Sequence, residues 1–314
     1  MAANGKWTAQ DLPDLSGKEI IVTGGNSGIG YEAALQFARK GASVILACRN
    51  MTKAAAAAAQ IKAAYPAANV EPMALDLSSL ASIREFAASY RARHRALDIL
   101  VNNAGVMAIP YARTADGFEM QFGTNHLGHF ALTGLLLEPL LAADHARVVT
   151  VSSGAHRMGQ VRFDDLNWEH GYAKWRAYGQ SKLANLLFTL ELQRRIDAHA
   201  GKIIAVACHP GYAATNLQAA GPRLEGSQLM ESLFGVANRV FAQSAAMGAL
   251  PTLYAAAAPD VRGGEYIGPD GLAEMWGNPT RVKRSAAAKD QSVATRLWNV
   301  SEQMTGVHYD ALPA

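Results

Sequence analysis

Short apolar runs rich in β-branched residues alternate along the chain with longer segments of helical periodicity. Such runs, bounded by glycine and polar residues, predict buried strands, whereas the longer periodic segments predict helices. The predicted strands cover residues 19–24, 42–49, 69–77, 97–105, 146–153, 202–211 and 264–268. The predicted helices cover residues 28–40, 51–65, 79–95, 117–142, 173–199 and 243–258, and the tail 284–314 is expected to be helical in part.

This alternation predicts the fold class. Continuous apolar strands separated by helices indicate a parallel sheet that is covered on both faces. Right-handed crossovers then give a doubly wound, Rossmann-type α/β fold. We expect a single domain over residues 1–314, with a seven-stranded, mainly parallel sheet and a core at about residues 15–270. The stretch 211–240 interrupts the alternation after the sixth strand, where an insertion at the carboxyl edge of the sheet can act as a lid.

Composition narrows the classes of protein that this chain can be. Hydrophobic residues make up 50% and charged residues 18% of the chain. The net charge is +3 and the basic residues form no block along the sequence, so a nucleic-acid partner is not indicated. The N-terminal sequence MAANGKWTAQDLPDLSGK has no apolar core of signal-peptide length, so no signal peptide is expected. The most apolar run is broken by Glu138 and Pro139, so no membrane span is expected. Cys48 and Cys208 are predicted on opposite halves of the sheet, and two unpaired thiols favour a cytoplasmic protein.

The sequence TGGNSGIG follows the first predicted strand and leads into a helix. Glycine in such a loop lets the backbone turn tightly and approach a diphosphate, which the positive end of the helix attracts. A glycine-rich loop alone could be a plain turn, but its place in the first strand–helix unit of a parallel sheet favours a dinucleotide site. The candidate residues are Gly24, Asn26, Ser27, Gly28, Ile29 and Gly30.

The end of the second predicted strand indicates which dinucleotide binds. A carboxylate there accepts a hydrogen bond from the ribose 2′-hydroxyl of NAD and repels the 2′-phosphate of NADP. This chain has Arg49 and Asn50, with Lys53 one turn further on, and no carboxylate. A guanidinium pairs with phosphate through two parallel bonds, so NADP(H) is favoured over NAD(H), although a solvated surface arginine would give the same sequence. The ends of the third and fourth strands add Asp76, Leu77, Asn103, Ala104 and Gly105 as candidate cofactor contacts.

Tyr178 and Lys182 lie four residues apart in AYGQSKLAN, at the start of the predicted helix 173–199. Positions i and i+4 share one face of a helix. A nearby ammonium favours the phenolate, so it lowers the pKa of a tyrosine from about 10 toward neutrality and makes the phenol a candidate general acid or base. The simpler interpretation is a partly buried tyrosine beside a lysine whose stem lies on apolar surface.

These motifs occur in a characteristic order. TGGNSGIG, NNAG, a serine pair after the fifth strand, YGQSK and HPG follow one another as in the short-chain dehydrogenase/reductase family, which the chain resembles over about residues 15–270. The segments LACRN, DGFEMQFGTNHLGHFALT, VSSGAHRMG and SKLANLLFTLELQRR resemble its retinol-dehydrogenase-like and protochlorophyllide-reductase-like branch. Ser153 and Tyr178 are also farther apart than the corresponding residues in shorter members of the family.

The resemblance implies roles for four residues. Tyr178 would give or take the proton at the substrate oxygen, Lys182 would lower its pKa, and Ser153 would hydrogen-bond the same oxygen. Asn125 would kink its helix and hold a water chain to Lys182. Donors placed at a carbonyl oxygen stabilise the charge that develops there during hydride transfer, which supports these roles chemically. The implied cofactor contacts also include Tyr178, Lys182, Pro210, Gly211 and Thr215.

Other residues compete for these roles. Tyr172 and Arg176 form a second i, i+4 pair, but they are expected to precede the regular helix. Ser152 adjoins Ser153, and alternation along the strand turns one of the two away from the site. No G-x-S-x-G sequence follows a strand, which argues against a hydrolase. No metal is expected, because the close spacing of a zinc site is missing from His126, His129, His156 and His209.

The predicted function is NADP(H)-dependent interconversion of a ketone or aldehyde with its alcohol. Two alternatives stay open: C=C reduction or epimerisation within the same family, and a non-catalytic protein that senses NADP(H). Apolar residues in 211–240, together with Phe163, Trp168 and Trp175, favour a lipophilic substrate, although they could equally form lid core or a subunit interface. The resemblance also implies a possible homodimer through the helices at 117–142 and 173–199.

Overall fold

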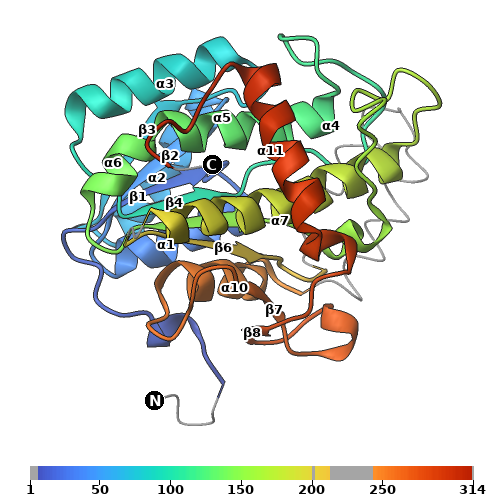
Figure 1. The fold of residues 1–314 in the computed structure, drawn as a ribbon. Coiled ribbons are helices and arrows are strands. Elements are labelled where there is room, and N and C mark those ends of the chain that lie inside the picture. The colour runs from blue at the N-terminus through green and yellow to red at the C-terminus, as the bar shows by residue number, and fades with distance from the viewer. Residues whose placement is uncertain (1–5, 200–201, 213–242, 313–314) are drawn as a thin grey trace.

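The centre of the molecule is an eight-stranded sheet with the strand order β3-β2-β1-β4-β5-β6-β7-β8. The computed structural model describes residues 6–199, 202–212 and 243–312, whose arrangement is drawn in Figure 1. All neighbouring strands run parallel except β8, which is antiparallel to β7. The predicted doubly wound α/β fold is therefore confirmed. The strands are β1 Glu19–Thr23, β2 Ser43–Cys48, β3 Asn69–Ala74, β4 Ile99–Asn102, β5 Arg147–Val151, β6 Ile204–Cys208, β7 Tyr266–Pro269 and β8 Pro279–Arg281.

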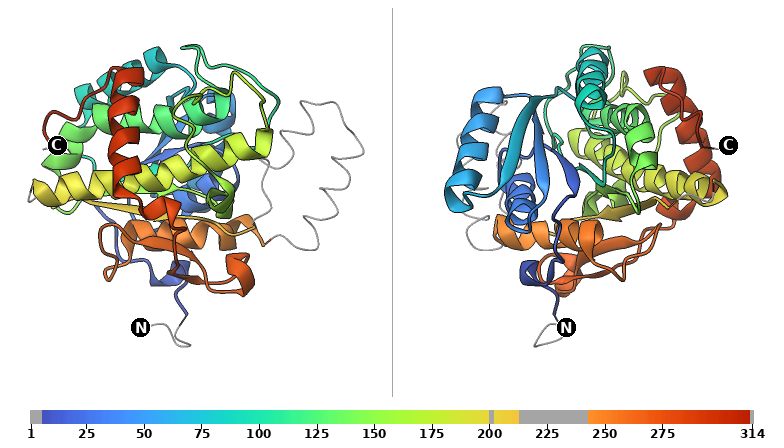
Figure 2. Two further views of the ribbon diagram at one scale, coloured as in Figure 1. Left: turned by 45° about the vertical axis from the view of Figure 1, so that its right-hand side comes forward. Right: turned by 90° about the vertical axis from the view of Figure 1, so that its left-hand side faces the viewer.

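Helices cover both faces of the sheet, as Figure 2 shows. Side chains at successive strand positions point to opposite faces, so a strand buried on both sides is a continuous apolar run. In β1, Ile20 and Val22 pack into the first helical layer, and Ile21 packs into the second. The first layer contains α1 (Gly28–Arg39), α2 (Met51–Ala64) and α10 (Ala245–Ala257), and the second contains α3 (Leu80–Arg93), α5 (Gly128–Leu135), α6 (Leu137–Ala142) and α7 (Lys174–Ala198).

The strand order reverses between β1 and β4, which lie side by side at the centre of the sheet. In a doubly wound sheet, a ligand crevice forms at such a point, outside the carboxyl ends of the strands. The segments that leave β1 and β4 begin at Gly24 and Asn103, so the glycine-rich loop and the NNAG motif both reach this edge. The fold therefore brings two sequence motifs together that are far apart along the chain.

The sheet has one strand more than the seven that were predicted. β8 consists of only three residues, Pro279–Arg281, at the outer edge next to β7. So short a segment carries no measurable alternation of apolar and polar residues. Its proline is tolerated because an edge strand leaves one row of backbone groups unpaired.

The predicted helix 117–142 is a series of shorter helices. It consists of α4 (Met120–Phe122), a π-helical turn at Gly123–Leu127, and then α5 and α6. The chain breaks between the last two at Leu136, whose φ and ψ are −101° and 11°. π-helical turns are rare and often occur at functional sites. The one in this chain contains Asn125, so a π-helical turn interrupts the helix where a kink was expected.

The C-terminal helix α11 (Gln291–Thr305) packs across α7 and α5 (Figure 1). Trp298 stacks on Phe188 with ring centroids 5.9 Å apart. After the helix, the Tyr309 hydroxyl donates to the carbonyl oxygen of Phe130 at 2.6 Å. The tail thus completes the core on this side and covers part of the two helices through which a homodimer was predicted. A dimer of that kind would have to use the surface that α11 leaves exposed.

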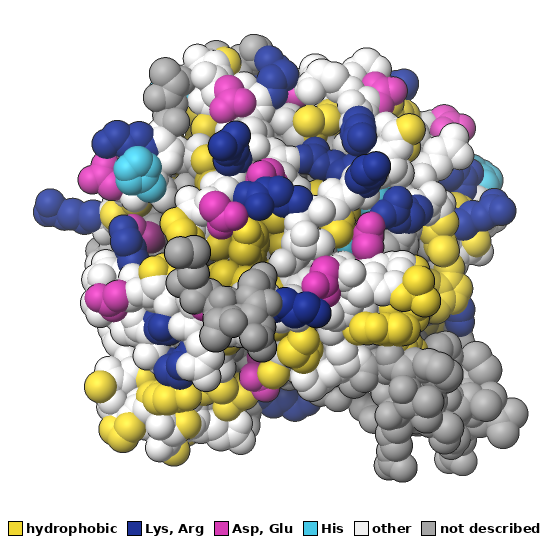
Figure 3. All heavy atoms as spheres, turned by 90° about the horizontal axis from the view of Figure 1, so that it is seen from below, with side chains coloured by type: hydrophobic (Ala, Val, Ile, Leu, Met, Phe, Trp, Pro, Cys, Tyr) yellow, Lys and Arg dark blue, Asp and Glu magenta, His cyan; other side chains and the backbone are white. Residues whose placement is uncertain are grey.

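Several broad expectations can be compared with the described residues. The predicted lid 211–240 falls almost wholly outside them. No described helix combines the length and the apolar character that crossing a bilayer requires. Cys48 and Cys208 are both buried and free, and β1, β4 and β5 lie between their strands, as expected for thiols that cannot pair. On the face drawn in Figure 3, basic and acidic side chains are interspersed.

Candidate functional site

A cavity of about 510 Å³ opens at the carboxyl ends of the central strands and reaches one turn of α7. This volume lies in the range of ligand-binding pockets. Of the predicted residues, Gly211 does not belong to the wall, and Thr215 lies outside the described residues. The predicted cofactor contacts that do line the cavity are Gly24, Asn26, Ser27, Gly28, Ile29, Gly30, Arg49, Asn50, Asp76, Leu77, Asn103, Ala104, Gly105, Tyr178, Lys182 and Pro210.

The loop after β1 requires glycine for two different reasons. Gly24 and Gly28 have φ angles of +66° and +54°, in the left-handed region that other residues seldom adopt. At Gly30 the constraint is space, because an added Cβ would lie 2.5 Å from Nδ2 of Asn103 and 2.5 Å from the carbonyl oxygen of Gly24. Within the described residues, Ser27 makes no side-chain capping bond to α1. The first amides of this helix can therefore bind an anion.

The hydroxyl of Thr23 connects the ends of β1 and β4. It accepts hydrogen bonds from the backbone amides of Asn103 and Ala104, each at 2.9 Å. Nε2 of His129 lies 2.9 Å from the same oxygen, and burial lowers the pKa of that histidine to about 4, so its ring is neutral near pH 7. Thr23 opens the TGGNSGIG motif but was not among the candidate residues, because its partners come from segments far along the chain.

The end of β2 presents two cations to the cavity. Arg49 and Lys53 are exposed, line the wall, and have no ion-pair partner among the residues that the structure describes. Between them, Oδ1 of Asn50 accepts a hydrogen bond from the backbone amide of Lys53 at 2.9 Å and thereby caps α2. Two exposed cations beside a cavity, with no carboxylate at the end of β2 itself, are suited to an anionic group of a ligand.

Asp76, beyond the end of β3, also lines the cavity. Its Oδ1 accepts from the backbone amide of Ser78 at 2.9 Å and from the Ser78 hydroxyl at 2.6 Å. Such a turn holds an aspartate side chain against its own backbone. Leu77, between them, is buried and contributes apolar surface to the wall.

Asn125 connects the loop after β4 to α7 but does not line the cavity itself. Its Oδ1 accepts from the backbone amide of Val106 at 2.8 Å, and its Nδ2 donates to the carbonyl oxygen of Val106 and to Oγ of Ser181, both at 2.9 Å. An added Cβ at Gly105 would lie 2.8 Å from Oδ1 of Asn125 and 3.7 Å from Nζ of Lys182. Asn125 therefore supports the wall next to the lysine.

Tyr178 and Lys182 line the cavity from α7, and only 5% and 4% of their surfaces are exposed. Nζ of the lysine lies 5.7 Å from the centroid of the phenol ring and donates to the carbonyl oxygen of Val151 at 3.1 Å. Burial raises the pKa of Tyr178 to about 12 against the effect of a hydrogen bond with Ser153, and it lowers the pKa of Lys182 to about 8. The expected lowering of the tyrosine pKa is thus not found for the protein groups alone, because desolvation of the phenolate dominates.

The two serines after β5 point in different directions, as strand alternation predicts. The Ser153 hydroxyl acts on the phenol of Tyr178, whose pKa it lowers, and it accepts from the backbone amide of Ala155 at 3.2 Å. The Ser152 hydroxyl is buried and donates to the carbonyl oxygen of Lys182 at 2.8 Å. Ser152 rather than Ser153 forms part of the cavity wall, but the Ser153 hydroxyl is the one that acts on Tyr178. Ser153 therefore remains the candidate.

The competing residues have structural roles. The Tyr172 hydroxyl donates to the carbonyl oxygen of Ile109 at 2.8 Å and does not line the cavity. Arg176 lies within α7, which begins at Lys174, so the expectation that this pair precedes the helix is wrong for the arginine. His126 is fully buried against Ser301. In the described part of the chain, no three His, Cys, Asp or Glu side chains form a group that could hold a metal ion.

The aromatic residues expected around a lipophilic pocket lie elsewhere. Trp168 is buried beneath the Arg162 guanidinium, 4.3 Å from the ring centroid, and Phe163 lies under Arg296. Trp175 is 43% exposed, and its ring meets that of Tyr178 edge-on at 6.3 Å. Other residues line the same cavity as Tyr178, and the sequence did not single them out because only the fold brings them there. They include Val106, Met120, Thr124 and Val151.

Comparison with known proteins gives consistent matches over most of the chain. The family model described as short chain dehydrogenase matches residues 18–223. Retinol dehydrogenase 13 of Homo sapiens is 44% identical over 296 residues, which cover 93% of this chain and 86% of that protein. Retinol dehydrogenase 12 of Mus musculus is 42% identical over 298 residues, with coverage of 94% and 89%. The crystal structure of an uncharacterized protein from Mycobacterium paratuberculosis is 44% identical and has a TM-score of 0.80, with coverage of 97% and 99%.

Proposed function

Since the chain belongs to the short-chain dehydrogenase/reductase family, whose members are NAD(P)(H)-dependent oxidoreductases, we propose that it uses NADP(H) to interconvert a ketone or aldehyde with its alcohol. One observation carries this proposal: Tyr178 and Lys182 line the same cavity as the glycine-rich loop and Arg49. A proton donor and a dinucleotide cradle within one cavity are what hydride transfer to a carbonyl requires.

The residues around the cavity fit NADP(H). Gly30 lets the glycine-rich loop pack closely against Asn103, and the uncapped amides at the start of α1 suit a diphosphate. Arg49 and Lys53 would hold the 2′-phosphate, and no carboxylate at the end of β2 would repel it. The adenine would lie between Asp76 and the apolar side chain of Leu77. The nicotinamide end would meet other residues of the wall, which are Asn103, Ala104, Gly105, Tyr178, Lys182 and Pro210.

When bound, the dinucleotide supplies or accepts the hydride. The residues of the chain then act on the substrate oxygen and its proton. The Tyr178 hydroxyl keeps its proton near pH 7, because burial raises its pKa to about 12, and it gives up that proton only to an oxygen that gains negative charge. Ser153 donates a second hydrogen bond to that oxygen. Lys182, whose pKa is about 8, is mostly protonated at neutral pH and stabilises the phenolate that is left.

We propose a lipophilic substrate. Val106, Met120 and Val151 give the cavity an apolar part. The relatives at 44% and 42% identity are named for retinol, which is a lipophilic alcohol. A cytoplasmic location and a homodimer stay predictions from the sequence.

The substitution Tyr178→Phe tests the proposal. It removes the proton but keeps the ring, so we expect kcat for carbonyl reduction to fall by about 10²–10⁴-fold with folding and NADPH affinity retained. Tyr172→Phe is the matched control, because it removes a hydroxyl that is bonded outside the cavity wall. Its kcat should stay close to that of the wild type. Carbonyl reduction by Tyr178→Phe at nearly the wild-type rate would refute the proposed mechanism.

A further inference from the structure

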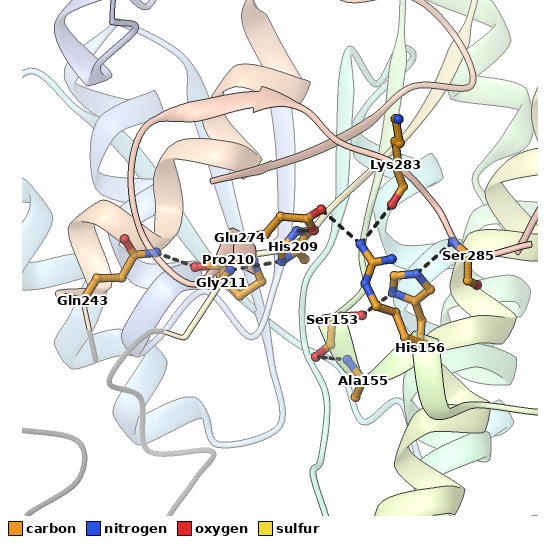
Figure 4. Close-up of polar contacts among 11 residues, drawn as sticks. Ser153, Ala155, His156, His209, Pro210, Gly211, Gln243, Glu274, Lys283 and Ser285 are labelled. Carbon is orange, nitrogen blue, oxygen red and sulfur yellow. Dashed lines mark hydrogen bonds and ion pairs between the residues drawn. The ribbon is translucent and has the colours of Figure 1, made fainter. Parts of the chain in front are cut away.

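The carboxylate of Glu274 joins two loops that border the proposed reaction site. Oε2 lies 3.1 Å from Nε2 of His209, in the loop after β6. Oε1 accepts from Nη2 of Arg157 at 3.0 Å, in the turn that follows Ser153. Figure 4 shows Glu274 beside His209, with Ser153 and His156 on the far side of the carboxylate. Glu274 does not line the cavity, so it can affect the reaction only through these loops.

The hydrogen bonds of His209 determine which ring nitrogen carries the proton. The backbone amide of Gly211 donates to Nδ1 at 3.3 Å, so Nδ1 is an acceptor and Nε2 donates its proton to Glu274. The ring has little room to turn, because it is 2% exposed and a Cβ at Gly268 would collide with Nε2. His209 therefore links the carboxylate to the backbone next to Pro210, which lines the cavity.

The turn on the other side of the carboxylate is held by the segment after β8. Nη2 of Arg157 also donates to the carbonyl oxygen of Lys283 at 3.1 Å. Nε2 of His156 accepts from the backbone amide of Ser285 at 3.3 Å, and its Nδ1 therefore donates to the carbonyl oxygen of Ser153 at 2.7 Å. These contacts converge on Ser153, whose hydroxyl lowers the pKa of Tyr178.

The turn that carries Glu274 has an unusual backbone. Ala273 and Glu274 have φ angles of +52° and +58°, and two successive non-glycine residues in this region are strained. Such a conformation persists only where its surroundings impose it. The carbonyl oxygen of the next residue, Met275, accepts from the backbone amide of Tyr212 at 2.7 Å. The turn is thus bound to the loop after β6 by backbone as well as by side chain, and the fold does not depend on the carboxylate alone.

We propose that Glu274 is a positioning residue, which holds the Ser153 hydroxyl and the wall at Pro210 in register on either side of Tyr178. This inference rests on the proposed function, because the position of Ser153 matters only if its hydroxyl binds the substrate oxygen. A carboxylate is required, since it accepts from His209 with one oxygen and from Arg157 with the other. A glutamine has one acceptor oxygen, so in either orientation its amide nitrogen faces a donor.

The test compares Glu274→Gln with Glu265→Gln. Glu265 is also paired with an arginine, Arg281, and its side chain is 20% exposed, against 24% for Glu274. It precedes β7 and therefore lies at the opposite edge of the sheet from the cavity. We expect Glu274→Gln to lower kcat about tenfold, while the substrate KM, the NADPH Kd and the melting temperature change little. The reason is that a misplaced donor reduces the stabilisation of the transition state rather than the binding of the ground state. Glu265→Gln should leave kcat unchanged.

A double variant tests the bridge itself. Arg157→Gln removes the same contact from the other side. The double variant Arg157→Gln/Glu274→Gln should therefore have a kcat little lower than that of the less active single variant. Losses that multiply would overturn the proposal, as would an unchanged kcat in Glu274→Gln or an equal loss in Glu265→Gln. The His209 signal in ¹⁵N-histidine spectra can be identified as the one that Glu274→Gln shifts. If that signal shows the proton on Nδ1, the proposed hydrogen bond from Nε2 of His209 to Glu274 is wrong.

Ser153→Ala separates this inference from the proposed function. A large loss of kcat in Ser153→Ala together with none in Glu274→Gln would refute the positioning role and leave the proposed function standing. An unchanged rate in Ser153→Ala would refute both, since the hydroxyl would then have no part in the reaction.

Discussion

The side-chain amide of Asn125 donates a hydrogen bond of 2.9 Å to Oγ of Ser181. The first residue lies in the π-helical turn, and the second lies in α7 directly before Lys182. The Ser181 hydroxyl in turn donates to the carbonyl oxygen of Tyr178 at 2.8 Å. Both side chains are fully buried, so water cannot replace either partner. This bond therefore ties the loop after β4 to the helix that carries the proposed acid/base pair.

Ser181→Ala should loosen that connection. It removes a partner from the buried amide of Asn125, which costs roughly 1–3 kcal/mol in the free energy of unfolding. We expect kcat to fall about tenfold as well, because Tyr178 and Lys182 lose their register with the cavity wall. Urea unfolding and steady-state kinetics measure the two effects. Thr189→Val is the control, since it removes another buried hydroxyl from α7, one bonded to Asn185. A similar kcat loss in the control would indicate general loosening of the helix.

Arg49→Glu should change the cofactor preference. The substitution replaces a candidate phosphate ligand by a carboxylate that repels the 2′-phosphate and can accept from a 2′-hydroxyl. The loss of one charge-assisted pair, about 1.5–3 kcal/mol, predicts a Kd for NADPH that is at least about tenfold higher, with NADH binding retained or improved. Fluorescence titration measures both constants. Lys62→Glu, on the exposed side of α2, reproduces the charge change away from the cavity. Unchanged NADPH affinity in Arg49→Glu would contradict the assignment.

The buried ammonium of Lys182 predicts a pH-dependent stability. Burial lowers its pKa from the ordinary 10.5 to about 8, so between these values the unfolded chain binds more protons than the folded one. The stability of the wild type relative to Lys182→Met should therefore rise from about pH 8 to 10.5, by roughly 3 kcal/mol in total. Below pH 7 the difference should be flat. Urea unfolding of both proteins without cofactor at several pH values measures this difference, and a decrease with rising pH would contradict burial as the dominant cause.

Gly30→Ala should damage the cofactor cradle. The new Cβ would press on Asn103 and on the carbonyl oxygen of Gly24, which should cost roughly 1–3 kcal/mol of stability. Because the loop must move to relieve this contact, the Kd for NADPH should rise as well. Gly154→Ala is the control for stability, since its Cβ would meet no described atom within 4 Å. Wild-type stability and NADPH affinity in Gly30→Ala would show that the loop has more space than the structure indicates.

Much of the fold follows from local patterns. The run that contains Ile20, Ile21 and Val22 is apolar at every position because helices cover both faces of the sheet. Short motifs such as the glycine-rich loop also carry their own backbone requirements, so Gly24 and Gly28 could be identified without coordinates. The order of such elements was enough to predict cofactor contacts at the ends of the first four strands.

Other features depend on partners that are distant in the chain. β8 is only three residues long and exists because β7 offers it an edge. Thr23 and His129 meet across 106 positions, and no local pattern encodes their contact. Glu274 reaches His209 and Arg157 from a turn that the sequence did not single out.

The sequence by itself determined which chemical groups the protein possesses and which strand of the sheet each group follows. The tertiary structure decided how those groups behave. Spacing placed Lys182 one turn from Tyr178 and predicted a lowered tyrosine pKa, but the folded protein excludes water from both residues and raises that pKa to about 12. The physical reason is that desolvation depends on everything packed around a group, whereas a sequence pattern records only its neighbours along the chain.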